Sequence, residues 1–133
     1  MGSVAALVAA VDDAGVGTIV LLASGSPYLL GTSHDSLGVG PSALELLRTL
    51  TIVAEAGARA TLNASASVEA PRRVLLVGGA GTVVRLRSVD VTGGFVHGIG
   101  AYGGGVRVLG GSTLVLDDCR LRGNVMRATG NDR

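Results

Sequence analysis

The sequence of 133 residues contains no lysine and no tryptophan, and it has only three aromatic residues, Tyr28, Phe95 and Tyr102. A hydrophobic core must therefore be built from valine, leucine, isoleucine and alanine. All 11 basic residues are arginines, and against 10 acidic residues they leave a net charge of +1. No stretch combines clustered arginines with interleaved aromatic residues, so nucleic acid is not expected as a partner.

Cysteine and long apolar segments are equally scarce. Cys119 is the single cysteine, which excludes a disulfide within the chain. No apolar run approaches the roughly 18 residues that span a bilayer, so no membrane span is expected. Residues 4–11 do not resemble a signal peptide, because no cation precedes them and two aspartates follow. No metal-ligand spacing is present, and we expect no cofactor.

Glycine is abundant, with 22 residues, and it divides the chain into short segments. Ser3 can cap a helix over residues 4–14, where four apolar residues recur at helical spacing before Gly15 (Val4, Leu7, Val8 and Val11). Short β-branched runs then predict strands; these are residues 18–22, 28–30, 50–53 and 60–62. Residues 31–42 are predicted to form a loop. Periodicity leaves residues 43–48 open between helix and strand.

An internal repeat organises residues 72–124. A shift of about 30 residues superimposes the apolar positions of one unit on those of the next (Val84 on Leu114, Leu86 on Leu116, Val89 on Cys119, Val91 on Leu121). The first strands match at a shift of about 31, with Leu75 on Val106 and Val77 on Val108. A repeat of this length is typical of a solenoid, in which successive coils stack as parallel strands.

The same register makes a prediction about charge. Arg87 should lie beside Asp117, and Asp90 beside Arg120, with all four side chains pointing outward. Opposite charges side by side on neighbouring strands stabilise a sheet, by about 0.2–1 kcal/mol per pair. Cys119 then lies in an inward column and is expected to pack as a small apolar side chain.

Residues 103–124, GGGVRVLGGSTLVLDDCRLRGN, resemble a coil of the right-handed parallel β-helix proteins, the pectin-lyase-like superfamily. They are most similar to the repeats of polymorphic outer-membrane proteins, with residues 104–106 as the GGAI-like start and 121–124 as the FxxN-like end. The resemblance implies one all-β domain over residues 1–133, a right-handed parallel β-helix of about four coils. Residues 1–16 would form the N-terminal cap and residues 17–133 the coils. It also implies an extracellular or cell-surface location.

The candidate binding residues are Phe95, His97 and Tyr102, which lie in the glycine-rich segment 93–105 between two predicted coils. Functional side chains are often carried by loops on a rigid scaffold. These three residues could form a small sugar-contacting surface. In the alternative, Phe95 and Tyr102 cover the side of the stack and His97 is solvated.

Enzymatic alternatives find only partial support in the sequence. Asp117-Asp118 and His97-Gly98 resemble two motifs of the polygalacturonases, but their order is reversed and the other two motifs are missing. Pectate lyases bind Ca²⁺ through clustered carboxylates, whereas the aspartates here are scattered over different coils. Residues 74–86 imitate a dinucleotide-binding glycine loop, but a β-patterned run follows where that motif needs a helix.

The sequence therefore predicts a non-catalytic β-helix module of a surface or secreted protein, in an adhesion, structural or carbohydrate-associated role. The alternative is a polysaccharide lyase or glycoside hydrolase of the same superfamily. Expected partners are a polysaccharide, or another protein chain at an exposed coil end, because the last coil offers no cap and would leave strand edges open.

Overall fold

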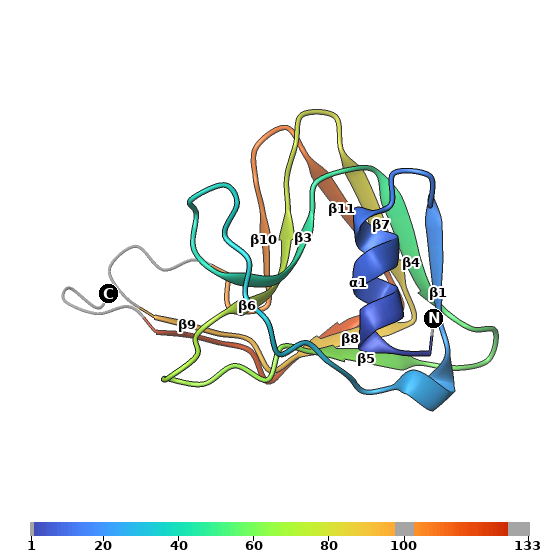
Figure 1. Cartoon of the computed structure of the whole chain (residues 1–133), viewed down its shortest axis with the longest axis horizontal. Helices are drawn as coiled ribbons and strands as arrows, with labels where there is room; N and C mark the ends of the chain where they lie inside the picture. Colours follow the sequence, from blue (N-terminus) through green and yellow to red (C-terminus); the bar gives the residue numbers. More distant parts are fainter. Residues whose placement is uncertain (1, 98–102, 128–133) are drawn as a thin grey trace.

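A computed structural model of the chain describes residues 2–97 and 103–127. They form an all-β parallel solenoid of about three turns with one short N-terminal helix, and the coil has a three-sided outline (Figure 1). Sheet A contains β1 (Thr18–Leu21), β4 (Leu50–Ala54), β7 (Val83–Arg87) and β11 (Thr113–Asp117). Sheet B contains β2 (Tyr28–Leu29), β5 (Ala60–Asn63), β8 (Val89–Thr92) and β12 (Arg120–Leu121). Sheet C contains β3 (Ser42–Leu46), β6 (Arg73–Val77) and β10 (Val106–Val108).

The register predicted from the repeat is confirmed. In sheet A, Val84 lies beside Leu114 and Leu86 beside Leu116, and in sheet C the shift is 31, with Leu75 beside Val106. Sheet A holds four strands, so the chain makes three turns between β1 and β11, against the about four coils expected. Residues 43–48, for which the sequence left helix and strand open, contribute to the strand β3. The segment is extended because it pairs in parallel with β6.

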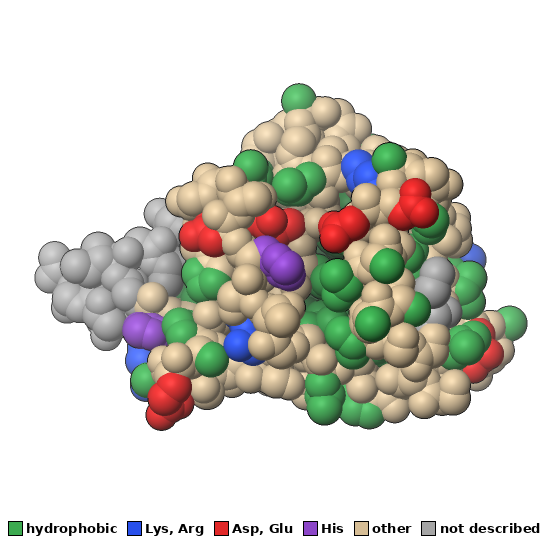
Figure 2. Space-filling view, viewed as in Figure 1, with side chains coloured by type: hydrophobic (Ala, Val, Ile, Leu, Met, Phe, Trp, Pro, Cys, Tyr) green, Lys and Arg blue, Asp and Glu red, His purple; other side chains and the backbone are tan. Residues whose placement is uncertain are grey.

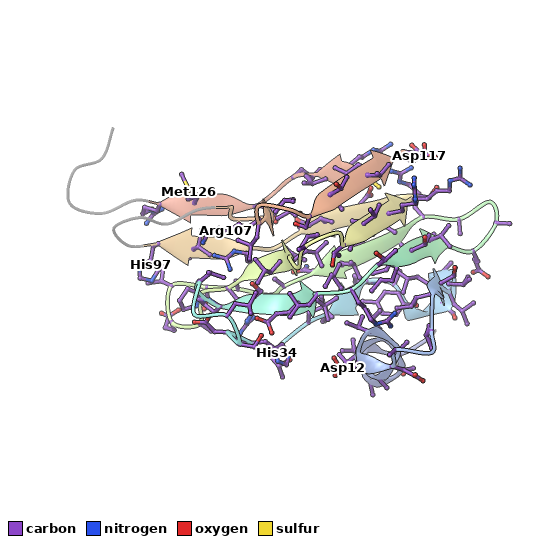
Figure 3. All side chains as sticks on the ribbon, turned by 90° about the horizontal axis from the view of Figure 1, so that it is seen from above. Asp12, His34, His97, Arg107, Asp117 and Met126 are labelled. Carbon is purple, nitrogen blue, oxygen red and sulfur yellow. The ribbon has the colours of Figure 1, made fainter. Side chains whose placement is uncertain are left out.

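The helix α1 (Val4–Asp12) closes one end of the stack (Figures 1 and 3). The Ala6 N–H donates to the Ser3 side chain at 3.1 Å, as expected of an N-cap. Leu7 is fully buried and Val11 is 6% exposed, so the helix lays its apolar face on the core of the first coil. The helix ends at Asp12, two residues before the predicted end. No helix in residues 2–97 or 103–127 is long and apolar enough to cross a membrane.

The loop predicted at residues 31–42 lies beside β3 and β6 on the outside of the coil (Figure 1). The buried Arg73 side chain holds it there by donating to the carbonyl oxygens of Val39 and Gly40 and to the Ser42 hydroxyl, at 2.9–3.1 Å. Burial lowers the pKa of Arg73, and the nearby positive charge of Arg107 lowers it further. All five residues of β6 are consequently buried, because the core covers one face and this loop covers the other.

The chain after β8 differs from the sequence prediction. Part of the expected glycine-rich loop is a strand, β9 (Phe95–His97), which pairs in parallel with β13 (Val125–Arg127) one turn later. Asp90 was expected to point into solvent but is only 8% exposed. It does lie beside Arg120 in the ladder, yet its ion pair is with Arg59, whose side chain covers it.

Candidate functional site

Two of the three candidate binding residues come together on β9. The rings of Phe95 and His97 are 5.6 Å apart between centroids and are tilted by 55°. They are two positions apart on one strand, so both side chains leave the same face of it. Phe95 is half-buried and His97 is exposed. Tyr102 lies outside the described residues.

The neighbouring strand adds an arginine to this pair. Arg127 lies beside His97 in the ladder, and its guanidinium carbon is 5.6 Å from the centre of the Phe95 ring. This distance is that of a cation–π contact, which is electrostatic and stronger when water is excluded. The Phe95 ring thus serves partly to hold Arg127, while His97 presents its imidazole to solvent. The surface formed by Phe95, His97 and Arg127 therefore presents hydrogen-bond donors to a ligand, and its aromatic ring is already in contact with Arg127.

A larger site lies on the outer face of sheet A. We define the sheet A groove as the depression of about 300 Å³ over β4, β7 and β11. It is lined mainly by outward-facing side chains of these strands, namely Thr51, Val53, Arg85, Arg87, Val115 and Asp117. A second depression of about 410 Å³ adjoins it and shares Val53 and Arg87, so the hollow continues toward the turn after β4. The groove therefore crosses the strands and follows the stacking direction of the coils.

Two arginines give the sheet A groove its charge. Arg87 donates from Nε to an Asp117 carboxylate oxygen at 3.0 Å, the outward pair that the repeat predicts. Within the described residues, its two terminal nitrogens have no hydrogen-bond partner. The Arg85 side chain is exposed and makes no hydrogen bond or ion pair with the rest of the described chain. Both arginines sit beside valines, because the alternation of each strand directs these positions outward.

Arg59 forms a network that the sequence pattern did not reveal. Its guanidinium donates to Asp90 at 2.9 Å and to the Asp118 carboxylate at 3.0 Å, joining three successive coils. These hydrogen bonds hold the pKa of Asp90 below its usual range, and the pKa of Arg59 is raised in turn. Arg59 lies in the turn before β5, outside the repeat, so the repeat predicts no partner for it. The repeat instead matched Asp90 with its ladder neighbour Arg120, so nothing in the sequence pattern pointed to Arg59.

The carboxylates that resemble a polygalacturonase motif are engaged separately. Asp117 accepts from Arg87 and Asp118 from Arg59, in two different ion pairs. Cys119 is partly buried against the core, as predicted for its inward column, and its thiol lies 3.2 Å from the Leu86 carbonyl oxygen. Within the described chain, no group of three histidine, cysteine or acidic side chains could hold a metal ion.

Comparison of the chain with protein-family models, with curated proteins and with solved structures found no match. The fold is therefore established from the coil geometry alone, and function is argued from the surfaces described above.

Proposed function

We propose that this chain is a non-catalytic β-solenoid module of a surface or secreted protein that binds an extended acidic polysaccharide. The observation that carries the proposal is the sheet A groove, in which Arg85 and Arg87 lie over an apolar floor that includes Val53 and Val115. The resemblance of residues 103–124 to the pectin-lyase-like β-helices supports the same class of ligand.

The chemistry of the groove suits uronic acids. A planar guanidinium binds a carboxylate through two parallel hydrogen bonds, a geometry that an ammonium cannot offer. Valine side chains can contact the C–H face of a sugar ring, and the Asp117 carboxylate can accept from a hydroxyl group. The groove crosses three strands, so it fits a chain of sugars better than a single small molecule.

The test is binding of an oligogalacturonate by the full chain, measured by calorimetry, with a neutral dextran of equal length as the reference. We expect the oligogalacturonate to bind and the dextran not to bind. Arg85→Ala should weaken binding at least about tenfold, because a hydrogen bond to a charged group contributes about 1.5–3 kcal/mol. Arg122→Ala is the matched control, since Arg122 is also an exposed arginine with no side-chain hydrogen bond or ion pair in the described chain, and it follows β12 in a different sheet.

Equal losses in Arg85→Ala and Arg122→Ala would mean diffuse attraction by net charge and would contradict a site in the groove. Failure of the unmodified chain to bind would contradict the proposal as a whole. Release of unsaturated uronides during the incubation would contradict the non-catalytic role and favour a lyase.

A further inference from the structure

A second cleft, of about 310 Å³, lies between α1 and β3 at the capped end of the solenoid. We call it the helix cleft. Val8, Val11 and Leu44 form an apolar floor, and Asp12, His34 and Glu45 stand around it. Figure 3 places Asp12 and His34 at the same end of the molecule, far from Asp117 and Met126, and Figure 2 shows acidic side chains around a histidine on this face.

The cationic side chain in the helix cleft is already used. Arg48 donates from all three of its guanidinium nitrogens to backbone carbonyl oxygens, those of Ala10, Val11 and Val16. The last carbonyls of a helix carry a partial negative charge, which this arginine offsets. Its positive charge is thus directed at the end of α1.

The two carboxylates of the cleft make no ion pair with Arg48. Glu45 accepts from the Ser36 N–H at 3.0 Å and from the Ser36 hydroxyl at 2.7 Å, both neutral donors. Neither Glu45 nor Asp12 forms an ion pair within the described residues. Two negative charges therefore border an apolar floor, in a cleft at the lower end of the volume range of small-ligand sites.

We propose that the helix cleft binds a primary ammonium group on a short alkyl stem, with the stem on Val8, Val11 and Leu44 and the ammonium between Asp12 and Glu45. A compact ammonium can donate to both carboxylates at once, and a stem of four or five carbons can cover the floor. These 133 residues contain no lysine, so none of their own side chains can supply the ammonium. It is either a free aliphatic amine or the lysine side chain of a partner protein.

The test is an NMR titration of the ¹⁵N-labelled full chain with n-pentylammonium, with 1-pentanol and pentanoate as probes of equal length. We expect pentylammonium to shift the amide signals of residues around the cleft and to bind at least about tenfold more tightly than either other probe. Binding should weaken as salt is added, because the attraction is between charges. Equal affinity for 1-pentanol and pentylammonium, or no shift at the cleft, would overturn the proposal.

Isosteric variants test which carboxylates attract the ammonium. Asp12→Asn combined with Glu45→Gln should lower the affinity for pentylammonium at least about tenfold, while Asp13→Asn should leave it unchanged. Asp13 is the neighbouring exposed aspartate and does not line the cleft. An equal loss in Asp13→Asn would overturn the proposal. If the double variant fails to fold, the probe comparison and the salt dependence in the unmodified chain still test whether the cleft binds an ammonium.

A capped lysine peptide distinguishes the two sources of the ammonium. Binding as tight as that of pentylammonium supports a partner's lysine, and binding of the free amine alone supports a small-molecule ligand. The Arg85→Ala variant should bind pentylammonium normally, so this inference and the polysaccharide proposal can fail independently.

Discussion

Arginine side chains join segments of this chain that are far apart in the sequence. Arg59 bridges three coils, Arg73 ties the loop 31–41 to sheet C, and Arg48 fastens the end of α1 to the first turn. A guanidinium has five donors in a fixed plane and can serve several acceptors at once, which a lysine ammonium cannot do over the same span. The absence of lysine is thus consistent with the structural use made of arginine at these three places.

Asp90 predicts how stability depends on pH. Hydrogen bonds from Arg59 lower the pKa of Asp90 in the folded chain, relative to about 3.9 for a free aspartate. Its contribution to stability is therefore present above that value and is lost as the pH falls through the lowered pKa. We expect Asp90→Asn to unfold at a lower urea concentration at pH 7, and the difference to disappear toward pH 2.

Urea unfolding followed by circular dichroism between pH 2 and 7 measures this. Asp117→Asn is the control, because the Arg87–Asp117 pair is exposed and such pairs contribute about 0–1 kcal/mol. A destabilisation by Asp90→Asn that stayed constant down to pH 2 would mean that the side chain acts through packing and not through its charge.

At the scale of elements, the corners between strands depend on glycine for two separable reasons. Gly57 and Gly93 both have a φ of +77°, which disfavours any residue with a Cβ. At Gly57 a Cβ would meet nothing within 4 Å, whereas at Gly93 it would collide with the carboxamide of Asn63 in the adjacent coil. These two glycines therefore share the backbone requirement, and of the two only Gly93 also lies in close contact with the adjacent coil.

A pair of alanine variants separates these effects. Gly57→Ala should cost about 1–2 kcal/mol from the backbone conformation alone. Gly93→Ala should cost about 1–3 kcal/mol more, because crowding between coils adds to the same strain. Chemical denaturation of both variants provides the comparison, and equal losses would show that the Asn63 side chain moves aside freely.

The repeat made most of this fold predictable, because stacking in register forces the same pattern on each coil. The positions of β6, β7, β8, β10, β11 and β12 follow from it, as does the Arg87–Asp117 pair. The strands β9 and β13 were missed, since three residues beside glycines carry no period; they pair with each other, and Phe95 of β9 also donates its N–H to the Arg72 carbonyl oxygen. The helix cleft was also missed, because Asp12, His34 and Glu45 are brought together by the cap helix and a long loop.

The two ends of the solenoid differ in how far their inward-facing side chains are exposed. One column through sheet A consists of Ile19, Ile52, Leu86 and Leu116. The first three are 0–1% exposed, whereas Leu116, in the last described coil, is 44% exposed. Leu121 and Val108 are 43% exposed at the same end. The edges of β10, β11 and β12 are likewise unpaired on that side within the described residues, as the sequence predicted for the last coil.

We expect the chain in isolation to associate through this end, because apolar side chains and unpaired strand edges lie together there. The helix α1 covers the opposite end of the coil, so head-to-tail stacking of copies would require displacing it. The uncapped ends of two copies can meet, and such a contact uses the same surface on both copies and closes at two chains.

Sedimentation equilibrium should therefore show a monomer–dimer equilibrium, and Leu116→Arg should shift it toward monomer at least about tenfold by placing a charge in the contact. Val68→Arg is the control, because Val68 is 60% exposed in the segment between β5 and β6, away from this end. A chain that stays monomeric at millimolar concentration would contradict the prediction. Growth into larger open-ended assemblies would show instead that a coil of another copy displaces the helix α1 and stacks head to tail.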